Sequence, residues 1–197
     1  MIFKNLNQKI ICSDLNFDKI YPKAYQEHSA RHFTPVKIAI KAARLLVDKE
    51  DDKILDIGSG VGKFCCIGAS TTSAHFYGVE KRKNLINLSN KIKRNYKLKN
   101  AHFIHKDFTQ LDFKKFNGIY FFNSFHENFD ETCVLDDTSK VSLKLYHTYH
   151  QNLILKLNEC RKGTKLVTFH TLKNKIPSTY QFIDMNETGL IKLYIKK

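Results

Sequence analysis

Apolar residues in this chain form short, nearly continuous runs that alternate with longer stretches of mixed character. The short runs are typical of strands that are buried in a sheet, and residues 117–123 are the most apolar of them. In the longer stretches apolar residues recur every three or four positions, which predicts helices that bury one face. The predicted strands are residues 53–57, 74–79, 101–105, 117–123, 165–169, 180–184 and 190–195. The predicted helices are residues 34–47, 61–69, 82–98 and 138–160.

The order of these elements predicts the fold class. Strands that alternate with helices indicate an α/β protein, a three-layer αβα sandwich with a mostly parallel seven-stranded sheet. Residues 186–189, Asn-Glu-Thr-Gly, separate the last two strands and predict an antiparallel C-terminal hairpin. Residues 34–197 are therefore expected to form one domain. Residues 1–33 are aromatic and weakly periodic, which predicts an N-terminal extension or lid.

The first long helix has a recognisable start signal. Thr34 is predicted to be its N-cap, because a threonine hydroxyl can accept from an amide of the first turn. Pro35 fits the first helical position, where no backbone donor is needed.

The chain is strongly basic, with 33 Lys and Arg against 19 Asp and Glu and a formal net charge of +14. Such a balance favours a polyanionic partner such as nucleic acid. Lysines that lie on solvent-exposed faces without binding a partner would give the same excess of basic residues. The helix at residues 81–99 carries many of the cations but lacks the interleaved aromatic residues typical of a single-strand binder.

The cysteines indicate a reducing compartment. Their number is odd, and they form neither a Cys-x-x-Cys pair nor a zinc-binding pattern, so no metal site is expected. They are Cys12, Cys65, Cys66, Cys133 and Cys160. No apolar run approaches the roughly 20 residues of a membrane span. We therefore expect a cytoplasmic protein without membrane association, a monomer or a weak dimer.

The stretch most informative about function is residues 53–64, Lys-Ile-Leu-Asp-Ile-Gly-Ser-Gly-Val-Gly-Lys-Phe. It predicts a strand, a glycine-rich turn and a helix start, which together can hold a nucleotide or nucleoside. A phosphate-binding P-loop is excluded, because the spacing is one residue short and Phe64 replaces the required hydroxyl. A dinucleotide fingerprint is disfavoured, because the third glycine, Gly62, comes one residue early and Asp56 precedes the turn.

The pattern Asp56-x-Gly58-Ser59-Gly60-x-Gly62 resembles motif I of the class I methyltransferases that use S-adenosylmethionine. Glycines let backbone approach a ligand closely, and an acid suits a cofactor with a positively charged amino group. The resemblance implies further roles at the following strand ends. Glu80 would accept from the ribose hydroxyls, Asp107 would bind the adenine amino group, Phe108 would contact the adenine ring, and Asn123 would end the fourth strand at motif IV.

The acceptor of the methyl group is expected near residues 122–128, Phe-Asn-Ser-Phe-His-Glu-Asn. Amino-methylating enzymes of nucleic acids carry Asn or Asp, two prolines and an aromatic residue here, and both prolines are missing. Asn123, His126 and Glu127 are the predicted catalytic residues, the last two as a base or as groups that position the acceptor.

Two narrower resemblances concern the acceptor. The chain is similar to small bacterial methyltransferase-domain proteins with His-aromatic-Thr-Pro-Val before motif I, here residues 32–36. It also partly resembles the non-SET histone lysine methyltransferases in residues 56–62, in Val79-Glu80 and in Asn123-x-Phe125. The expected reaction is methylation of a nitrogen or oxygen, on a protein or nucleic acid.

Three alternatives stay open at this point. A non-catalytic module that binds the cofactor or a nucleic acid would keep the fold and the glycine loop. A small-molecule methyltransferase would keep the whole cofactor site. A nicotinamide enzyme would bind NAD instead of S-adenosylmethionine, which a comparison of the two cofactors decides.

Overall fold

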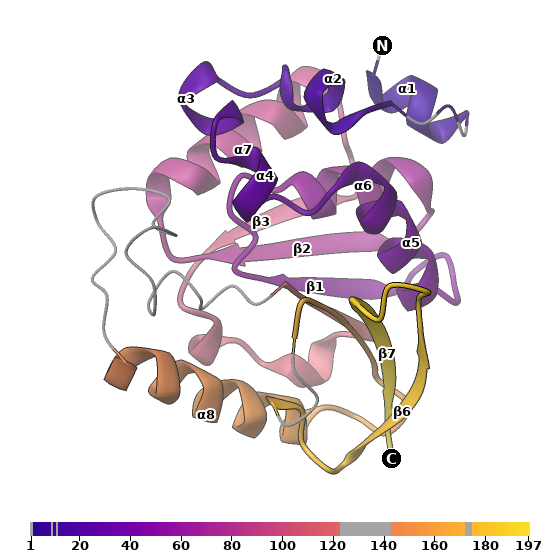
Figure 1. Ribbon diagram of the computed structural model, residues 1–197, viewed down its shortest axis with the longest axis vertical. Coiled ribbons are helices and arrows are strands. Elements are labelled where there is room, and N and C mark those ends of the chain that lie inside the picture. Colours follow the sequence, from indigo (N-terminus) through magenta and orange to yellow (C-terminus); the bar gives the residue numbers. More distant parts are fainter. Residues whose placement is uncertain (1, 9, 11, 123–142, 172–174) are drawn as a thin grey trace.

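A seven-stranded sheet with the order β3-β2-β1-β4-β5-β7-β6 forms the centre of the molecule (Figure 1). The computed structural model describes residues 2–8, 10, 12–122, 143–171 and 175–197. The strands are β1 (Lys53–Ile57), β2 (His75–Glu80), β3 (Ala101–His105), β4 (Gly118–Phe122), β5 (Lys165–Phe169), β6 (Tyr180–Met185) and β7 (Ile191–Lys196). All seven predicted strands are confirmed, and each of their ends agrees with the prediction to within one residue.

The sheet is parallel except for β7, which pairs antiparallel with both β5 and β6. Strand β1 lies inside the sheet, with β2 on one side and β4 on the other, both parallel to it. The chain therefore reverses its direction of progress through the sheet at the carboxyl end of β1. In open α/β sheets, this switch point is where ligands bind.

Helices cover both faces of the sheet, which confirms the three-layer sandwich (Figure 1). One face is covered by α5 (Val36–Leu46), α6 (Lys63–Thr71) and α7 (Lys83–Tyr96). The other is covered by α8 (Leu143–Glu159) and the short 3₁₀ helices η1 (Phe108–Gln110) and η2 (Phe113–Lys115). Among the described helices, none combines the length and the apolar character needed to cross a membrane.

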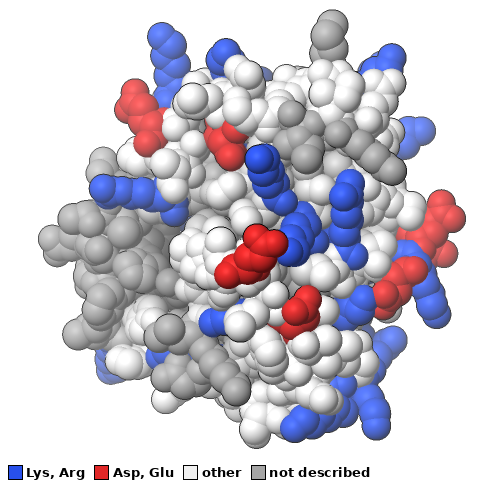
Figure 2. Space-filling view, turned by 45° about the vertical axis from the view of Figure 1, so that its right-hand side comes forward, with Lys and Arg blue, Asp and Glu red and all other residues white. Residues whose placement is uncertain are grey.

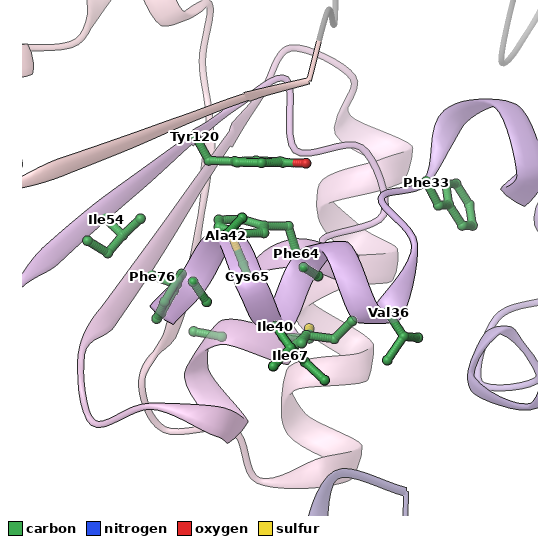
Figure 3. Close-up of a cluster of buried hydrophobic side chains, with 14 of the residues drawn as sticks. Phe33, Val36, Ile40, Ala42, Ile54, Phe64, Cys65, Ile67, Phe76 and Tyr120 are labelled. Carbon is green, nitrogen blue, oxygen red and sulfur yellow. The ribbon is translucent and has the colours of Figure 1, made fainter. Parts of the chain in front are cut away.

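Alternation along the strands divides the core into two clusters. On β1, Ile54 packs towards α5 and α6, whereas Leu55 packs towards α8. On β4, Tyr120 faces the first cluster and Phe121 the second. Figure 3 shows the first cluster, in which the Phe64 ring stacks on the Tyr120 ring with 3.9 Å between their centroids. This stack fixes the start of α6 over the sheet, and with it the glycine loop.

The predicted N-cap of α5 is wrong. The helix begins at Val36, after Pro35 in extended conformation, and Thr34 makes no capping bond. The Thr34 hydroxyl instead lies 3.0 Å from the Tyr120 hydroxyl, in the buried interior. The amide of Val36 donates to Asp14 Oδ1 at 2.8 Å, so a carboxylate from the N-terminal residues caps the helix in place of threonine.

The N-terminal residues form four short helices, α1 (Ile2–Asn7), α2 (Asp14–Asp18), α3 (Lys23–Gln26) and α4 (Ser29–His32), which lie on the α6–α7 side of the sheet (Figure 1). Phe3, Phe17 and Phe33 are buried in the same cluster as the sheet residues. The Phe3 ring lies 4.9 Å from the Tyr96 ring of α7. This segment is thus continuous with the core, and its function as a lid stays a prediction.

The surface charge is mixed on the face that Figure 2 shows. Lysine and arginine side chains are distributed over this face, and acidic side chains lie among them. The net charge of +14 is therefore not gathered there in one continuous basic tract.

Candidate active site

The glycine loop lies at the carboxyl end of β1 and leads into α6. Gly58, Gly60 and Gly62 all have positive φ values, of 70°, 54° and 78°. Such left-handed conformations cost a residue with a Cβ about 1–2 kcal/mol, which explains the glycines. The amides of Gly58 and Ser59 both donate to the Val79 carbonyl at 3.0 Å, so the loop is held against the end of β2.

The second and third glycines serve different purposes. A Cβ at Gly62 would lie 2.5 Å from the Phe103 ring, so Gly62 is required by packing inside the protein. A Cβ at Gly60 would have no atom within 4 Å. The loop backbone at Gly60 thus borders open space, which gives a ligand a place to approach it closely.

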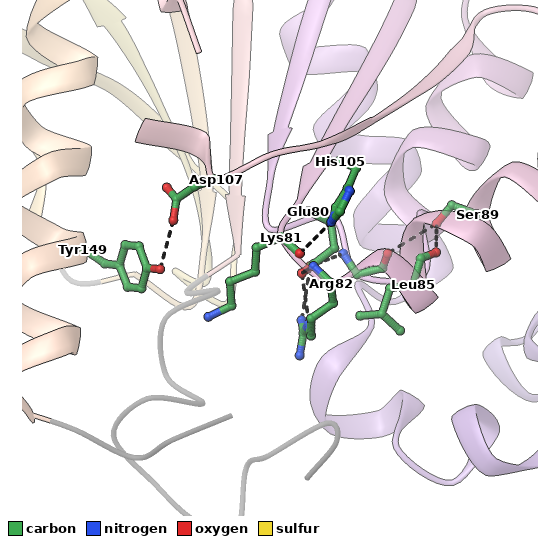
Figure 4. A network of polar contacts seen from close by, with 9 residues as sticks. Glu80, Lys81, Arg82, Leu85, Ser89, His105, Asp107 and Tyr149 are labelled. Atoms are coloured by element: carbon green, nitrogen blue, oxygen red, sulfur yellow. Dashed lines mark hydrogen bonds and ion pairs between the residues drawn. The ribbon is translucent and has the colours of Figure 1, made fainter. Parts of the chain in front are cut away.

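Glu80 lies directly beside this open position, at the end of β2. Its side chain is buried, and its Oε2 accepts from the Gly60 amide at 3.1 Å. Its Oε1 accepts from the Arg82 backbone amide at 3.0 Å and from Arg82 Nε at 2.9 Å (Figure 4). Its Oε2 also accepts from a terminal guanidinium nitrogen of Arg82 at 3.2 Å. Four donor groups, one from Gly60 and three from Arg82, therefore fix the carboxylate at the edge of the loop.

Asp56 lies beneath the loop and is buried. The pKa of Asp56 is raised to about 7, mainly by burial; a hydrogen bond from Cys65 opposes this rise, and the nearby negative charge of Glu80 adds to it. The thiol of Cys65 lies 3.5 Å from Asp56 Oδ2. A cation placed above the loop would stabilise the ionised form of Asp56 and lower this pKa.

Asp107 follows β3 and is the N-cap of η1. Its Oδ1 accepts from the amide and the hydroxyl of Thr109, at 2.9 and 2.8 Å. Its Oδ2 accepts from the Tyr149 hydroxyl of α8 at 3.0 Å (Figure 4). The Phe108 side chain is buried, with its ring 5.8 Å from the Tyr149 ring. Asp107 is thus held in one orientation beside the crevice, while the Phe108 ring belongs to the core.

The helix α4 lies close to the Glu80–Arg82 pair. The pKa of His32 is lowered to about 4, mainly by burial, with smaller contributions from the positive charges of His28 and Arg82. His32 is therefore neutral at physiological pH.

The structure brings most of the predicted cofactor residues to one edge of the sheet. Residues 56–62, Glu80 and Asp107 occupy the carboxyl ends of β1, β2 and β3. The predicted catalytic residues Asn123, His126 and Glu127 lie outside the described residues. Within the described ranges, no group of three or more His, Cys, Asp or Glu side chains could hold a metal ion.

Sequence reasoning missed two groups that shape the site. Arg82 pairs with Glu80, and a cation two residues after the acid is a usable signal in the sequence. Tyr149 reaches Asp107 from a helix 42 residues further along the chain, and no sequence pattern indicates that contact.

Comparison with known proteins identifies the family. Residues 48–184, more than half of the chain, match the methyltransferase domain family. No curated protein sequence matches the chain.

Solved structures with the same fold include three informative examples. An RNA methyltransferase from Salinibacter ruber, in complex with S-adenosyl-L-homocysteine, has a TM-score of 0.57 at 17% identity, covering 83% of this chain and 91% of that one. TrmN from Thermus thermophilus has a TM-score of 0.64 at 16% identity, covering 88% of this chain and 52% of that one. Magnesium protoporphyrin IX methyltransferase from Synechocystis, with bound SAM, has a TM-score of 0.62 at 11% identity, covering 100% and 98%.

The chain therefore belongs to the methyltransferase domain family. Together with the strand order and the glycine loop, this makes it a class I methyltransferase that depends on S-adenosylmethionine.

Proposed function

We propose that this methyltransferase methylates a nitrogen or oxygen atom of a macromolecule, either a protein or a nucleic acid. The net charge of +14 supports a polyanionic macromolecule as the acceptor. The open position beside Gly60, bordered by the fixed carboxylate of Glu80, supports the cofactor site that supplies the methyl group. A ligand with hydroxyl groups that approaches the loop there can donate a hydrogen bond to the Glu80 carboxylate, and no side chain at Gly60 blocks its approach. The cysteines within the described residues are not joined in disulfides, which supports the cytoplasm as the place of the reaction.

The described residues fit the parts of S-adenosylmethionine, which when bound supplies a methyl group already activated on a sulfonium. Gly58 and Gly60 give backbone access, and the amino end of α6 suits a carboxylate. Asp56 attracts the amino group, Glu80 accepts from the ribose hydroxyls, and Asp107 accepts from the adenine amino group. Ser59, Gly62 and Phe108 complete the proposed cofactor set through loop shape and packing.

The chain then has mainly to hold and align the acceptor. We assign this task to Asn123, which follows β4, with His126 and Glu127 as a base or as positioning groups. A base is needed only where the acceptor atom carries a proton that must leave before or during the reaction.

Replacement of Glu80 by Gln is expected to weaken binding of S-adenosylmethionine by roughly 1–3 kcal/mol, because a charged acceptor for hydroxyl groups is lost. The measurement is the dissociation constant by titration calorimetry. Glu187→Gln, in the exposed turn of the hairpin, removes the same charge far from the loop and is expected to bind like the unmodified protein. Equal affinities for all three proteins would show that the ribose role of Glu80 is wrong.

The affinity for the cofactor is expected to rise about tenfold between pH 6 and pH 8, because Asp56, with a pKa of about 7, must ionise to attract an amino group. Without cofactor the same raised pKa lowers stability as the pH rises from about 4 to 7, since the unfolded chain ionises first. Calorimetry across this pH range, with Asp56→Asn as the control, tests the affinity. A pH profile shared by both proteins would contradict the assignment.

Transfer of a labelled methyl group tests the function directly. The protein is incubated with methyl-labelled S-adenosylmethionine and, separately, with nucleic-acid, protein and small-metabolite fractions of a cell lysate. Label in the nucleic-acid or protein fraction supports the proposal. Label confined to small metabolites would show a small-molecule enzyme, and tight cofactor binding without any transfer would show a non-catalytic module.

A further inference from the structure

Four exposed basic side chains lie together beside the proposed cofactor site, and we call them the basic rim: Lys81, Lys83, His105 and Lys106. The register pairs Glu80 with His105, so the chain segments after β2 and β3 are neighbours. His105 Nε2 lies 3.0 Å from the Lys81 carbonyl oxygen (Figure 4). The Lys106 amide donates to the Glu80 carbonyl at 3.2 Å.

The ammonium groups of the basic rim are not neutralised within the described part of the chain. No ion pair there involves Lys81, Lys83 or Lys106. Lys81 Nζ lies 5.3 Å from the centroid of the Tyr149 ring, above an aromatic face and not beside a carboxylate. The two nearby acids, Glu80 and Asp107, accept hydrogen bonds from other donors, from Arg82 and from Thr109 and Tyr149.

The basic rim also includes a cation at the N-terminus of α7, where positive charge is electrostatically unfavourable. Lys83 is the first residue of α7, Arg82 is its N-cap, and the first turn contains no acid. Cations at a helix N-terminus are unfavourable because they add to the positive end of the helix dipole. A ligand that brings negative charge to this place would relieve the repulsion.

The position of the basic rim indicates the size of the ligand. The rim lies at the ends of β2 and β3, whereas the acceptor is proposed to bind after β4. Neighbouring strands are about 4.8 Å apart, so the ends of β2 and β3 lie about 10 and 14 Å from the end of β4, with the proposed cofactor site between them. A small acceptor at β4 does not reach the basic rim, but a polymer does.

The chemistry of the basic rim favours nucleic acid over protein. Protein interfaces centre on buried apolar and aromatic anchors. The exposed large apolar side chains of the described residues lie elsewhere, at Ile10, Leu15, Leu155, Phe182, Ile183, Met185 and Leu190. A group of lysines without apolar or aromatic anchor residues is suited to contact a phosphate backbone.

We infer that the basic rim binds the phosphate backbone of a nucleic acid whose target base reaches the end of β4. This inference rests on the proposed function, because it assigns the acceptor of the same site. The target base must be unpaired or flipped out of a duplex, because a base inside the stack cannot reach the acceptor position.

The test is binding of a fluorescein-labelled single-stranded RNA of mixed sequence and of its DNA equivalent, by anisotropy over a range of salt concentrations. The rim variant is Lys83→Glu/Lys106→Glu. The matched control is Lys91→Glu/Lys99→Glu, which reverses two exposed charges on the same helix and at the opposite end of the same strand. Both variants change the net charge equally.

The rim variant is expected to bind the oligonucleotides at least tenfold more weakly in about 100 mM salt. The slope of log K against log salt should fall by about 1.4, the share of two phosphate contacts on a single strand. The control should bind like the unmodified protein. Equal losses in both variants would mean that general charge alone attracts the strand and would overturn the inference, as would competition by polyglutamate as strong as that by unlabelled RNA.

Calorimetry with S-adenosylmethionine separates this inference from the proposed function. If the inference about the basic rim is wrong, the unmodified protein still binds the cofactor, and the rim variant binds oligonucleotides with the affinity of the unmodified protein. If the proposed function is wrong, the unmodified protein binds no cofactor or transfers no methyl group.

Discussion

Replacement of Gly60 by Arg is expected to abolish binding of S-adenosylmethionine while leaving the protein folded. No protein atom lies within 4 Å of the position that a Cβ would take at Gly60, so the new side chain occupies the open space that the cofactor needs. A bulky cation there also repels a sulfonium. The dissociation constant should increase by at least a hundredfold in titration calorimetry.

The chain offers a matched control for the backbone strain at this position. Gly163 has a φ of 84°, and a Cβ there also meets no atom within 4 Å. Gly163→Arg should therefore lose a similar stability, about 1–2 kcal/mol for a left-handed residue with a side chain, and keep its cofactor affinity. Undiminished binding by Gly60→Arg, or equal losses of binding in both variants, would show that the cofactor does not lie on this loop.

Replacement of Lys63 by Met is expected to destabilise the protein by about 3–5 kcal/mol, the cost of leaving a buried charge without its partner. Lys63 is 3% exposed, and its Nζ lies 2.7 Å from a carboxylate oxygen of both Asp14 and Asp18. The side chain of Asp18 is 4% exposed, so water cannot replace the lost ammonium. The free energy of unfolding in denaturant measures this effect.

The position of Lys63 determines which part of the molecule should respond. Lys63 is the first residue of α6, directly after the glycine loop, while Asp14 also accepts from the first amide of α5. Cleavage of the N-terminal residues by a protease should therefore become faster in Lys63→Met. Lys63→Met/Asp18→Asn, which also removes the stranded carboxylate, should recover part of the stability.

A second lysine–aspartate pair provides the control. Lys165 pairs with Asp48, whose side chain is 63% exposed, and solvated pairs contribute at most about 1 kcal/mol. Lys165→Met should thus be nearly neutral. A loss below about 1 kcal/mol in Lys63→Met would show that the buried ion pairs do not hold the N-terminal residues in place.

Much of the fold could be predicted because its signals are local. Strands β1 to β5 have short apolar runs, and the glycine loop has three glycines at fixed spacing in a chain with 8. Once the strands are parallel, their carboxyl ends must share one edge. This requirement brings Glu80 and Asp107 to the glycine loop without any further information.

The contacts that could not be predicted join residues far apart in the sequence. Lys63 and Asp14 are 49 positions apart, and Thr34 meets Tyr120 across 86. A lysine after a glycine loop has the same local pattern whether it faces solvent or a buried aspartate. The prediction of Thr34 as the N-cap was wrong because both contacts involve distant residues. The Thr34 hydroxyl lies beside the buried Tyr120 hydroxyl, and Asp14 caps the start of α5 instead.

The central claim is that the glycine loop is built for S-adenosylmethionine, and calorimetric titration with this cofactor and, separately, with NAD tests it most directly. The account predicts saturable binding of one S-adenosylmethionine per chain and no detectable binding of NAD. Binding of NAD without binding of S-adenosylmethionine would contradict it.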